Sequence, residues 1–382
     1  MKKCYLKKGK DRSVLRGHPW VFSGALKAEV EKAGEWMELC DHQGTSLGLG
    51  FTENGSIAFK SIGSAFPSPE QAIVTRLQEA HTLRKDQGLV DRKDLDIYRL
   101  FFAEGDGLPG LIIDSYGAHA VVQIHSRAYL EHLELITEQL VLLGYRAVYL
   151  RQRSSLRDEK LEDGYLMGKR EEEVFLENGI PFHVDWEQGQ KTGFFIDQRD
   201  NRQLVRKLAS GKNVLNLFSY TGGFSSYALK GGARSVVSLD SSQAAVEMAC
   251  RNAELLDAAQ KHTGLTEDAF DYLKKMPEGF DLVVLDPPAF VKSPRSRHRA
   301  VQAYKRINAW AMKAMPSSST LLTFSCSQHL GRELFASTVR AAAIESGREV
   351  RLLQHLQQSV DHPSRMEHPE GEYLKGLLLQ LK

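Results

Sequence analysis

Three short segments of the 382-residue chain carry side chains whose types could do chemistry together. Residues 216–224 form a glycine-containing loop, Asp286-Pro-Pro-Ala289 precedes Phe290, and Cys326 lies between two serines. Each segment follows a short apolar run that is typical of a buried parallel strand. The carboxyl ends of parallel strands meet at one edge of an α/β sheet, where such folds bind ligands. A thiol beside a nucleoside-type site predicts covalent activation of a flat electrophilic ring, followed by group transfer.

The first loop and two acidic residues predict a nucleoside cofactor. Glycines at the start of a helix let the backbone approach a ligand, and the free N–H groups there suit a carboxylate or phosphate. Asp240 ends the second strand, where a carboxylate can accept both ribose hydroxyls, and Asp268 could meet an adenine amino group. A tight turn without a ligand is the structural alternative. The residues expected to contact the cofactor here are Phe218, Tyr220, Thr221, Gly222, Gly223, Asp240, Ser241, Asp268, Ala269, Phe270 and Asp286.

The kind of cofactor follows from what the glycine loop lacks and what precedes it. The loop is not G-x-G-x-x-G, which disfavours a nicotinamide dinucleotide, and no G-K-[ST] follows, which excludes a P-loop. Lys191 or Arg199 could hold an amino-acid carboxylate, and Asp197 its ammonium, so S-adenosyl-L-methionine fits better. The remaining cofactor contacts expected in residues 190–201 are Thr192, Phe194 and Gln198.

The second and third segments predict the reaction. The two prolines after Asp286 stiffen the turn, and Phe290 could stack on a flat base. Attack of the Cys326 thiolate on carbon 6 of a pyrimidine would let carbon 5 accept a methyl group, with Asp286 at ring N3, which suits cytosine. A cysteine at a strand end is otherwise typical of apolar packing.

Basic residues gather in two places although the net charge is only +2. Residues 1–16 carry seven basic side chains against Asp11, and residues 287–306 carry six with no acid. Two such patches predict two contacts with a polyanion, and a solvated lysine-rich surface is the alternative for the first. The expected substrate contacts are Pro287, Pro288, Phe290, Lys292, Arg295, Arg297, Arg299, Lys7, Arg12 and Arg16.

The order of patterns along the chain predicts three domains. Residues 1–70 show short alternating segments, 13–16 among them, that are typical of a small β-barrel. Residues 71–185 predict a central α+β domain with helices at 70–87 and 128–143, and a glycine-rich hairpin at 105–110 rather than a phosphate loop. In residues 186–382, strands near 213–218, 235–240, 281–286, 319–324, 350–353 and 374–381 alternate with helices, which predicts a doubly wound α/β sheet.

Composition narrows the class further. With 42% hydrophobic and 26% charged residues, the chain can bury real cores. The four cysteines form no C-x-x-C pair, which argues against a zinc knuckle or a redox dithiol, and we expect no metal. Free thiols also suit a reducing compartment. No uncharged apolar run is long enough to span a membrane, so we expect a cytoplasmic protein without a membrane partner.

Taken together, these segments resemble those of the bacterial 23S ribosomal RNA (cytosine-5)-methyltransferases that carry an N-terminal PUA domain, the RlmI type. The resemblance implies a PUA barrel, a central α+β domain, a class I S-adenosylmethionine-dependent methyltransferase domain with a Rossmann-like sheet, Cys326 as nucleophile and large-subunit ribosomal RNA as partner; a homodimer is compatible with it. The chain departs from related RNA enzymes in having Ala289 after Pro288, where many carry a second cysteine. The matching segments are residues 16–24, 102–110, 192–202, 216–224, 286–290, 325–327 and 370–376.

Three other functions share parts of this pattern. A uracil-5 methyltransferase would use the same thiol chemistry, and an exocyclic-amine methyltransferase would leave Cys326 as packing. An RNA-binding ribosome assembly factor would retain only a vestigial cofactor site.

Overall fold

The computed structural model describes residues 1–152, 162–171, 173–189, 192–290 and 297–382. By their contacts the residues form two compact units, and the chain passes between them more than once. The division into three domains with boundaries after residues 70 and 185 stays a prediction. Unit 1 comprises Met1–Phe175, Val184–Phe194 and Val360–Gly371, and unit 2 comprises Leu176–His183, Phe195–Ser359 and Glu372–Lys382.

The first sheet of unit 1 has five strands in the order β1-β3-β4-β5-β2. Alternate side chains of a strand point to opposite faces, and one face buries Val21, Leu39 and Phe59 in a small apolar core. The strands are β1 (Lys3–Tyr5), β2 (Trp20–Phe22), β3 (Trp36–Cys40), β4 (Ser46–Thr52) and β5 (Ile57–Gly63).

Residues 13–16 are not a strand, so that prediction was wrong. The stretch forms the one-turn helix α1 (Arg12–Leu15), in which Leu15 donates its backbone N–H to Asp11 O at 2.9 Å. Gly17 follows at φ +88°, a conformation that favours glycine. None of the residues of α1 is buried. Two adjacent apolar residues are too few to commit one face of a sheet, so local helical bonding decides the conformation.

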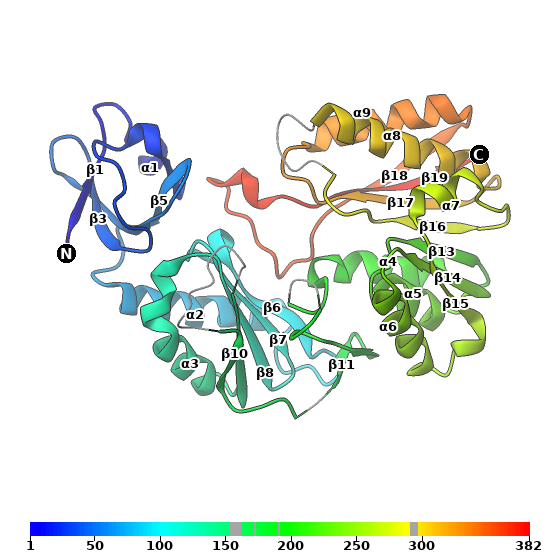
Figure 1. The fold of residues 1–382 in the computed structure, drawn as a ribbon, viewed down its shortest axis with the longest axis horizontal. Coiled ribbons are helices and arrows are strands. Elements are labelled where there is room, and N and C mark those ends of the chain that lie inside the picture. The colour runs from blue at the N-terminus through cyan, green and yellow to red at the C-terminus, as the bar shows by residue number, and fades with distance from the viewer. Residues whose placement is uncertain (153–161, 172, 190–191, 291–296) are drawn as a thin grey trace. The chain divides into compact units, whose positions relative to one another are not determined.

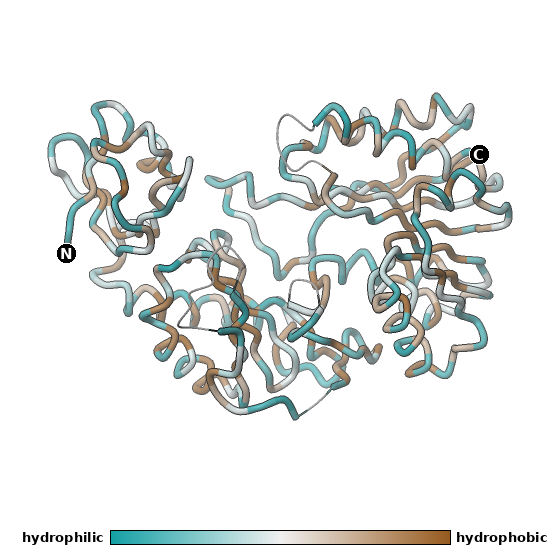
Figure 2. The backbone as a smooth tube through the Cα atoms, viewed as in Figure 1, coloured by the Kyte–Doolittle hydropathy of each residue, from teal (hydrophilic) through white to brown (hydrophobic). Residues whose placement is uncertain are grey.

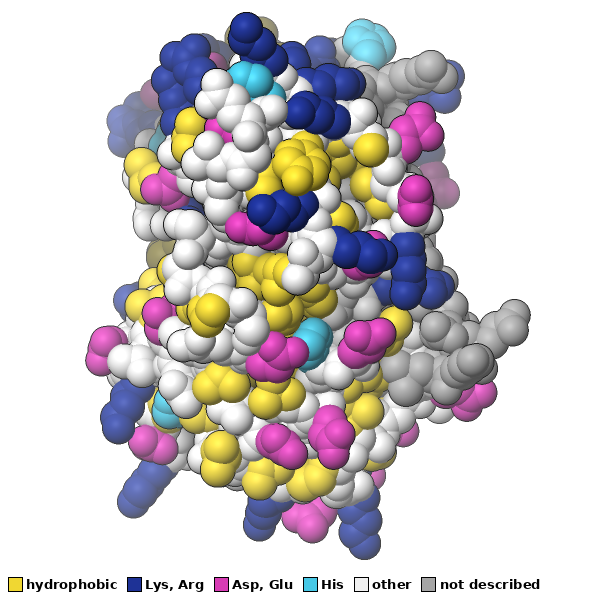
Figure 3. All heavy atoms as spheres, turned by 90° about the vertical axis from the view of Figure 1, so that its left-hand side faces the viewer, with side chains coloured by type: hydrophobic (Ala, Val, Ile, Leu, Met, Phe, Trp, Pro, Cys, Tyr) yellow, Lys and Arg dark blue, Asp and Glu magenta, His cyan; other side chains and the backbone are white. Residues whose placement is uncertain are grey.

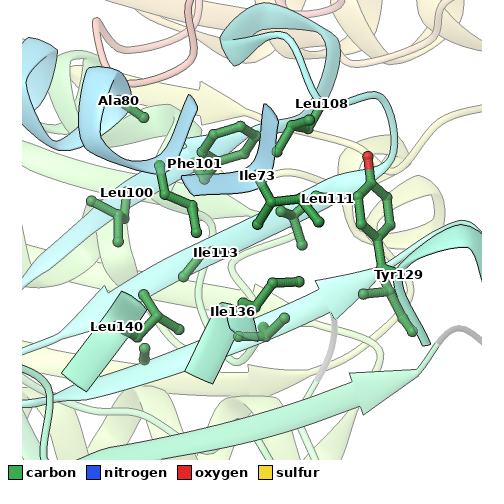
Figure 4. Packing of buried hydrophobic residues seen from close by; sticks show 14 of the residues in the cluster. Ile73, Ala80, Leu100, Phe101, Leu108, Leu111, Ile113, Tyr129, Ile136 and Leu140 are labelled. Carbon is green, nitrogen blue, oxygen red and sulfur yellow. The ribbon is translucent and has the colours of Figure 1, made fainter. Parts of the chain in front are cut away.

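The second sheet of unit 1, in the order β10-β9-β8-β7-β6, is packed against two helices. Figure 4 shows Ile73 of α2 and Ile136 and Leu140 of α3 directed toward strand residues such as Ile113. A short 3-10 turn, Ala103–Asp106, joins antiparallel β6 and β7, so the glycine-rich stretch is a hairpin as predicted. The elements are α2 (Pro69–Asp86), β6 (Ile97–Phe102), β7 (Leu111–Tyr116), β8 (His119–Ile124), α3 (Leu133–Leu142), β9 (Ala147–Gln152) and β10 (Gly164–Met167).

Unit 2 is built on a seven-stranded sheet in the order β15-β14-β13-β16-β17-β19-β18. The first five of these strands run parallel, whereas β19 is antiparallel to both of its neighbours. A two-stranded pair, β11 (Val174–Glu177) and β12 (Ile180–His183), precedes it in the chain. The strands are β13 (Asn213–Leu217), β14 (Ser235–Asp240), β15 (His262–Thr266), β16 (Leu282–Leu285), β17 (Thr320–Ser325), β18 (Val350–Leu356) and β19 (Lys375–Leu381).

Helices cover both faces of this sheet, with α8 and α9 above it and α4, α5 and α6 below it in Figure 1. Leu215 and Leu217 pack with the first group, and Val214 and Val236 pack with the second. The strands are therefore apolar on both sides, which Figure 2 shows as brown tube in the middle of the unit. This is the α/β doubly wound architecture that the sequence predicts. The helices are α4 (Arg199–Leu208), α5 (Gly223–Lys230), α6 (Gln243–Glu254), α7 (Ala269–Lys274), α8 (Arg297–Ala314) and α9 (Arg332–Ser346).

Candidate active site

The loop after β13 turns sharply before α5 begins. Phe218 and Tyr220 have positive φ values of 58° and 46°, which cost energy for residues that carry a Cβ. Two backbone bonds hold the turn: Ser219 N donates to Leu239 O at 3.0 Å, and Gly222 N donates to Ser219 O at 2.9 Å. Backbone strain of this kind is held in place by its surroundings and clusters at ligand sites.

Gly222 is the point at which this loop touches α6. It has φ +77°, and an added Cβ would lie 2.8 Å from Ala249 Cβ, closer than two carbon atoms can pack. Asn252 of α6 also donates from Nδ2 to Thr221 O at 2.8 Å. The close approach of the loop to α6 therefore requires glycine and fixes where the N-terminus of α5 lies.

Asp240 and Asp268 end up at the same edge as this loop because β13, β14 and β15 run parallel. Asp240 accepts the N–H of Tyr220 on Oδ2 at 2.9 Å and that of Ser242 on Oδ1 at 3.0 Å. Each carboxylate oxygen has a second lone pair, so Asp240 can hold both turns and still accept ribose hydroxyls. Asp268 caps α7 through Oδ1 alone, which accepts from Phe270 N and Asp271 N at 2.8 and 3.1 Å.

Ser219 brings to this edge a buried polar atom without a partner among the described residues. Ser219 is 6% exposed, and its Oγ has no hydrogen-bond partner among the residues that the structure describes. Buried hydroxyls are normally paired, so an orphan beside a strained loop fits a site that a polar ligand completes. Together with the free helix N-terminus and the two carboxylates, it fits a nucleoside cofactor.

Residues in the 3-10 turn just before α4, Ile196–Gln198, contact the proline turn and the segment before β19. Gln198 donates from Nε2 to Asp286 Oδ2 at 3.1 Å, and Tyr373 donates from Oη to Asp197 Oδ2 at 2.6 Å. Asp197, Gln198 and Arg199 are buried. A carboxylate, an amide and a guanidinium thus lie next to one another in the chain, and the first two contact other segments of unit 2.

The segment just before them belongs to unit 1. Thr192 is fully buried there, and its hydroxyl donates to Asp114, while Tyr116 Oη donates to Thr192 O at 2.9 Å. Phe194 is also buried. The cofactor roles of Thr192 and Phe194 stay predictions, and Lys191 lies outside the described residues.

Aromatic side chains surround Phe290, the residue expected to stack on a base. Its ring centroid lies 4.8 Å from that of Tyr304, 5.7 Å from Phe270 and 6.4 Å from Phe218. Phe290 is only half-buried, whereas Pro287 is buried and Pro288 exposed. The turn therefore brings an apolar, partly exposed ring to the edge that carries Asp286.

Cys326 directly follows β17. The residues on either side of it, Ser325 and Ser327, contact the phenol of Tyr304 and the amine of Lys375. Ser325 Oγ donates to Tyr304 Oη at 3.0 Å, and Ser327 Oγ lies 3.4 Å from the same oxygen. Lys375 donates from Nζ to Ser327 O at 2.6 Å. Burial raises the pKa of Tyr304, so this phenol stays protonated at neutral pH. The sequence had assigned no role to Tyr304 or Lys375.

Five of the predicted RNA contacts are described as exposed side chains. Arg297 and Arg299 lie in the first turn of α8. Lys7 lies just after β1, Arg12 begins α1, and Arg16 directly follows α1. Figure 3 shows Lys and Arg side chains gathered at the top of the face that it displays. Lys292 and Arg295 lie outside the described residues. Exposed cations of this kind can meet phosphates without giving up a buried partner.

None of the helices in the described part of the chain is both long enough and apolar enough to cross a membrane. Nor does a group of three or more His, Cys, Asp or Glu that could hold a metal ion occur among the described residues.

Comparisons with known proteins agree with this architecture. The model of the S-adenosylmethionine-dependent methyltransferase family matches residues 145–367, and that of the PUA-like domain matches residues 5–64. The ribosomal RNA large subunit methyltransferase I of Aeromonas salmonicida strain A449 is 41% identical over 99% of both chains. The protein of the same name from Escherichia coli O139:H28 is 38% identical over 97% of both.

Solved structures show the same fold at lower identity. SMU.776, described as a methyltransferase and solved with SAH, matches with a TM-score of 0.87 and 22% identity over 99% of this chain and 100% of its own. Trm5b from Pyrococcus abyssi matches with a TM-score of 0.55 and 14% identity over 99% of this chain and 98% of its own. The strained glycine loop, the acidic strand ends and the full-length similarity lead to one conclusion: the chain is an S-adenosylmethionine-dependent methyltransferase with a PUA-like domain, and it belongs to the family of ribosomal RNA large subunit methyltransferase I.

Proposed function

We propose that this enzyme methylates carbon 5 of a cytosine in large-subunit ribosomal RNA and that Cys326 is its nucleophile. The observation that carries the proposal is the pairing of β16 with β17, in which Leu285 lies opposite Thr323. Because the two strands are parallel neighbours, Asp286 and Cys326 emerge at the same edge of the sheet, as one flat base requires.

The chemistry divides between these two side chains. The thiolate of Cys326 adds to carbon 6, which makes carbon 5 nucleophilic, and S-adenosylmethionine supplies the electrophilic methyl group. Loss of the carbon-5 proton then restores the double bond between carbons 5 and 6 and expels the thiolate. Asp286, which already accepts a hydrogen bond from Gln198, is the carboxyl proposed to face ring N3.

Further support for an RNA substrate comes from charge and aromatic residues. The exposed cations of α1 and α8 suit phosphates, and half-buried Phe290 suits stacking on a base taken out of its helix. The family relatives carry ribosomal RNA in their names. A ribosomal RNA substrate would place the enzyme in the cytoplasm, and a homodimer stays a prediction.

The first prediction concerns Cys326→Ala. We expect 5-methylcytosine formation to fall by at least about 10³-fold, because the pyrimidine then has no nucleophile at carbon 6, while S-adenosylmethionine affinity stays within about twofold. The measurement is nucleoside mass spectrometry of ribosomal RNA from a strain lacking the enzyme, before and after treatment, combined with calorimetric titration of the cofactor.

Cys250→Ala is the matched control. Cys250 is also half-buried, but it lies on α6, and burial raises the pKa of its thiol, so methylation should be unaffected. Near-normal turnover of Cys326→Ala would contradict the covalent proposal and favour methylation of an exocyclic amine. If the methyl groups are found on uracil, the protein is a uracil-5 methyltransferase. If the unmutated protein does not bind the cofactor, the result favours an RNA-binding assembly factor.

A further inference from the structure

Lys375 is a lysine buried in the sheet at the catalytic edge. It is 4% exposed and lies opposite Ser325 where β19 pairs with β17. Lysine is rarely buried without a charged partner, since taking an ammonium out of water is costly unless other groups compensate its charge. A buried lysine one residue away from the nucleophile across a strand pair therefore needs a reason.

The hydrogen bonds of Lys375 leave one position open toward a further partner. Its Nζ donates to Ser327 O and to Tyr373 O, both at 2.6 Å. An ammonium has three N–H groups, so two carbonyls leave one donor. A neutral amine has two N–H groups and a lone pair, so the same two carbonyls leave one acceptor. The amine can thus either donate to a thiolate or accept from a thiol without losing its other bonds.

The charges around Lys375 single out the thiol as that partner. Burial lowers the pKa of Lys375 to about 8, a negative charge on Cys326 opposes this, and Arg332 at the start of α9 adds to it. Arg332 is itself within 3.6 Å of the exposed Glu372 carboxylate. Tyr304 of α8 contributes a phenol whose pKa is raised, partly by Cys326. Among the described groups that act on Lys375, the thiol is the anion-forming one.

We propose that Lys375 activates Cys326 by taking the thiol proton and then holding the thiolate as an ammonium–thiolate pair. The S–H bond breaks, an N–H bond forms, and the electron pair stays on sulfur for attack at carbon 6. When the carbon–sulfur bond breaks at the end of the reaction, the electron pair returns to a sulfur that again faces the ammonium. This proposal rests on the covalent function proposed for Cys326, and it makes Lys375 a positioning and activating residue rather than a group that contacts the base.

The second prediction tests this pair in the full-length enzyme without using turnover. In a variant whose other three cysteines, Cys4, Cys40 and Cys250, are replaced by serine, the rate of alkylation by iodoacetamide is followed against pH, because only the thiolate reacts. We expect a midpoint at least about one pH unit below the ordinary thiol value of ~8.5, and Lys375→Met to raise that midpoint by at least about one unit. Lys375→Arg, which keeps a cation, should preserve most of the shift.

A purely structural lysine would give a different result. Calorimetric titration of S-adenosylmethionine and thermal melts of both variants report whether the site and the fold survive, and these would change if Lys375 served only packing. If Lys375→Met does not fold, the unmutated thiol still decides, since a midpoint at or above ~8.5 overturns the proposal. An unchanged midpoint in folded Lys375→Met overturns it as well.

Failure of this proposal and failure of the covalent function give distinguishable results. Normal methylation by Cys326→Ala would show that Cys326 is not the nucleophile, whatever the midpoint of its alkylation. A depressed midpoint that does not depend on Lys375 would leave Cys326 as nucleophile and assign its activation to another group.

Discussion

At the scale of single residues, the candidate cofactor site depends on groups that have no room to vary. Gly222 touches Ala249, the hydroxyl of Ser219 is buried and orphaned among the described residues, and Phe218 and Tyr220 hold positive φ values. These features reinforce one another, because the strained turn aims the helix N-terminus and the close approach to α6 prevents the turn from relaxing. A change of one methyl group should therefore be felt by the cofactor.

The third prediction is that Gly222→Ala lowers S-adenosylmethionine affinity by at least about tenfold and destabilises the fold by ~1–3 kcal/mol. The positive φ and the 2.8 Å clash with Ala249 Cβ both oppose the new side chain. Calorimetric titration and chemical denaturation measure the two effects.

Gly232→Ala is the control that separates the effect of the positive φ from the effect of the clash. Gly232 has φ +83°, but an added Cβ would meet only Ser210 atoms, at 3.8 Å or more. The Gly232→Ala protein should lose about 1 kcal/mol of stability, and its affinity for S-adenosylmethionine should not change. Equal cofactor affinity of the two variants would contradict the role given to the loop.

At the scale of elements, a chain of polar groups joins α5 to three strands beneath the cofactor edge, and all of its members are buried except half-buried His262. Asn216 Nδ2 donates to Ser225 Oγ at 2.9 Å, Ser225 and Ser238 share a bond of 2.6 Å, and Ser238 Oγ lies 2.7 Å from His262 Nε2. Networks of this kind favour one register of the elements because they pair specific side chains, although Asn216 Oδ1 has no hydrogen-bond partner among the described residues. His262, the terminal member, is the titratable one.

The fourth prediction is a loss of stability in mild acid that depends on His262. Burial lowers the pKa of His262 to about 4, so the folded protein resists protonation. As pH falls below the ordinary imidazole value of ~6.5, the unfolded chain takes up a proton that the folded chain does not, and stability declines until pH ~4. Thermal melts between pH 7.5 and 4.5 should show a steeper decline for the unmutated enzyme than for His262→Gln.

His132→Gln is a comparison at a second histidine whose pKa burial also lowers, but which lies outside this network, next to α3. If His262→Gln reproduces the full pH dependence of the unmutated enzyme, the network does not carry it.

At the scale of the whole molecule, the two compact units are interleaved along the chain. The hairpin segment Leu176–His183 belongs to unit 2, although unit 1 residues flank it on both sides. Its Glu177 accepts from Arg202 Nε at 2.8 Å and from Tyr227 Oη at 2.8 Å, and all three side chains are buried. His183 N also donates to Asn252 Oδ1 at 2.8 Å. Unit 2 is therefore held partly by a segment that precedes its main body.

The fifth prediction is that Glu177→Gln destabilises the protein by about 3–5 kcal/mol, because it removes the carboxylate that pairs with the buried Arg202 guanidinium. Burial lowers the pKa of Arg202, but Glu177, together with Tyr227 and Asp197, outweighs that effect, so that the pKa is raised on balance. Chemical denaturation followed by intrinsic fluorescence measures the change.

Asp271→Asn provides the scale for comparison, since Asp271 pairs with Lys274 at 2.6 Å on an exposed surface. Water and salt screen the charges of an exposed pair, so this variant should be nearly neutral in stability. Similar losses in the two variants would show that burial of the Glu177–Arg202 pair does not matter.

Much of this protein follows from the sequence alone, for a local physical reason. Runs such as those of β13, β14 and β16 are apolar on both faces, and glycine, aspartate and proline follow them at the strand ends, so sheet, edge and cofactor class can be predicted together. Residues 13–16 show the limit, since two apolar residues do not decide between a strand and the turn of α1.

Only the tertiary structure decided which distant residues share the site. Lys375 lies opposite Ser325 and bonds Ser327 O, the two chain neighbours of Cys326, because β19 runs antiparallel beside β17. Tyr304 contacts Ser325 from α8. Neither pairing has a periodicity in the chain, since strand order and direction depend on how whole elements pack rather than on local pattern. The nucleophile could therefore be predicted from its strand end, whereas the buried amine that is proposed to activate it could be found only in the fold.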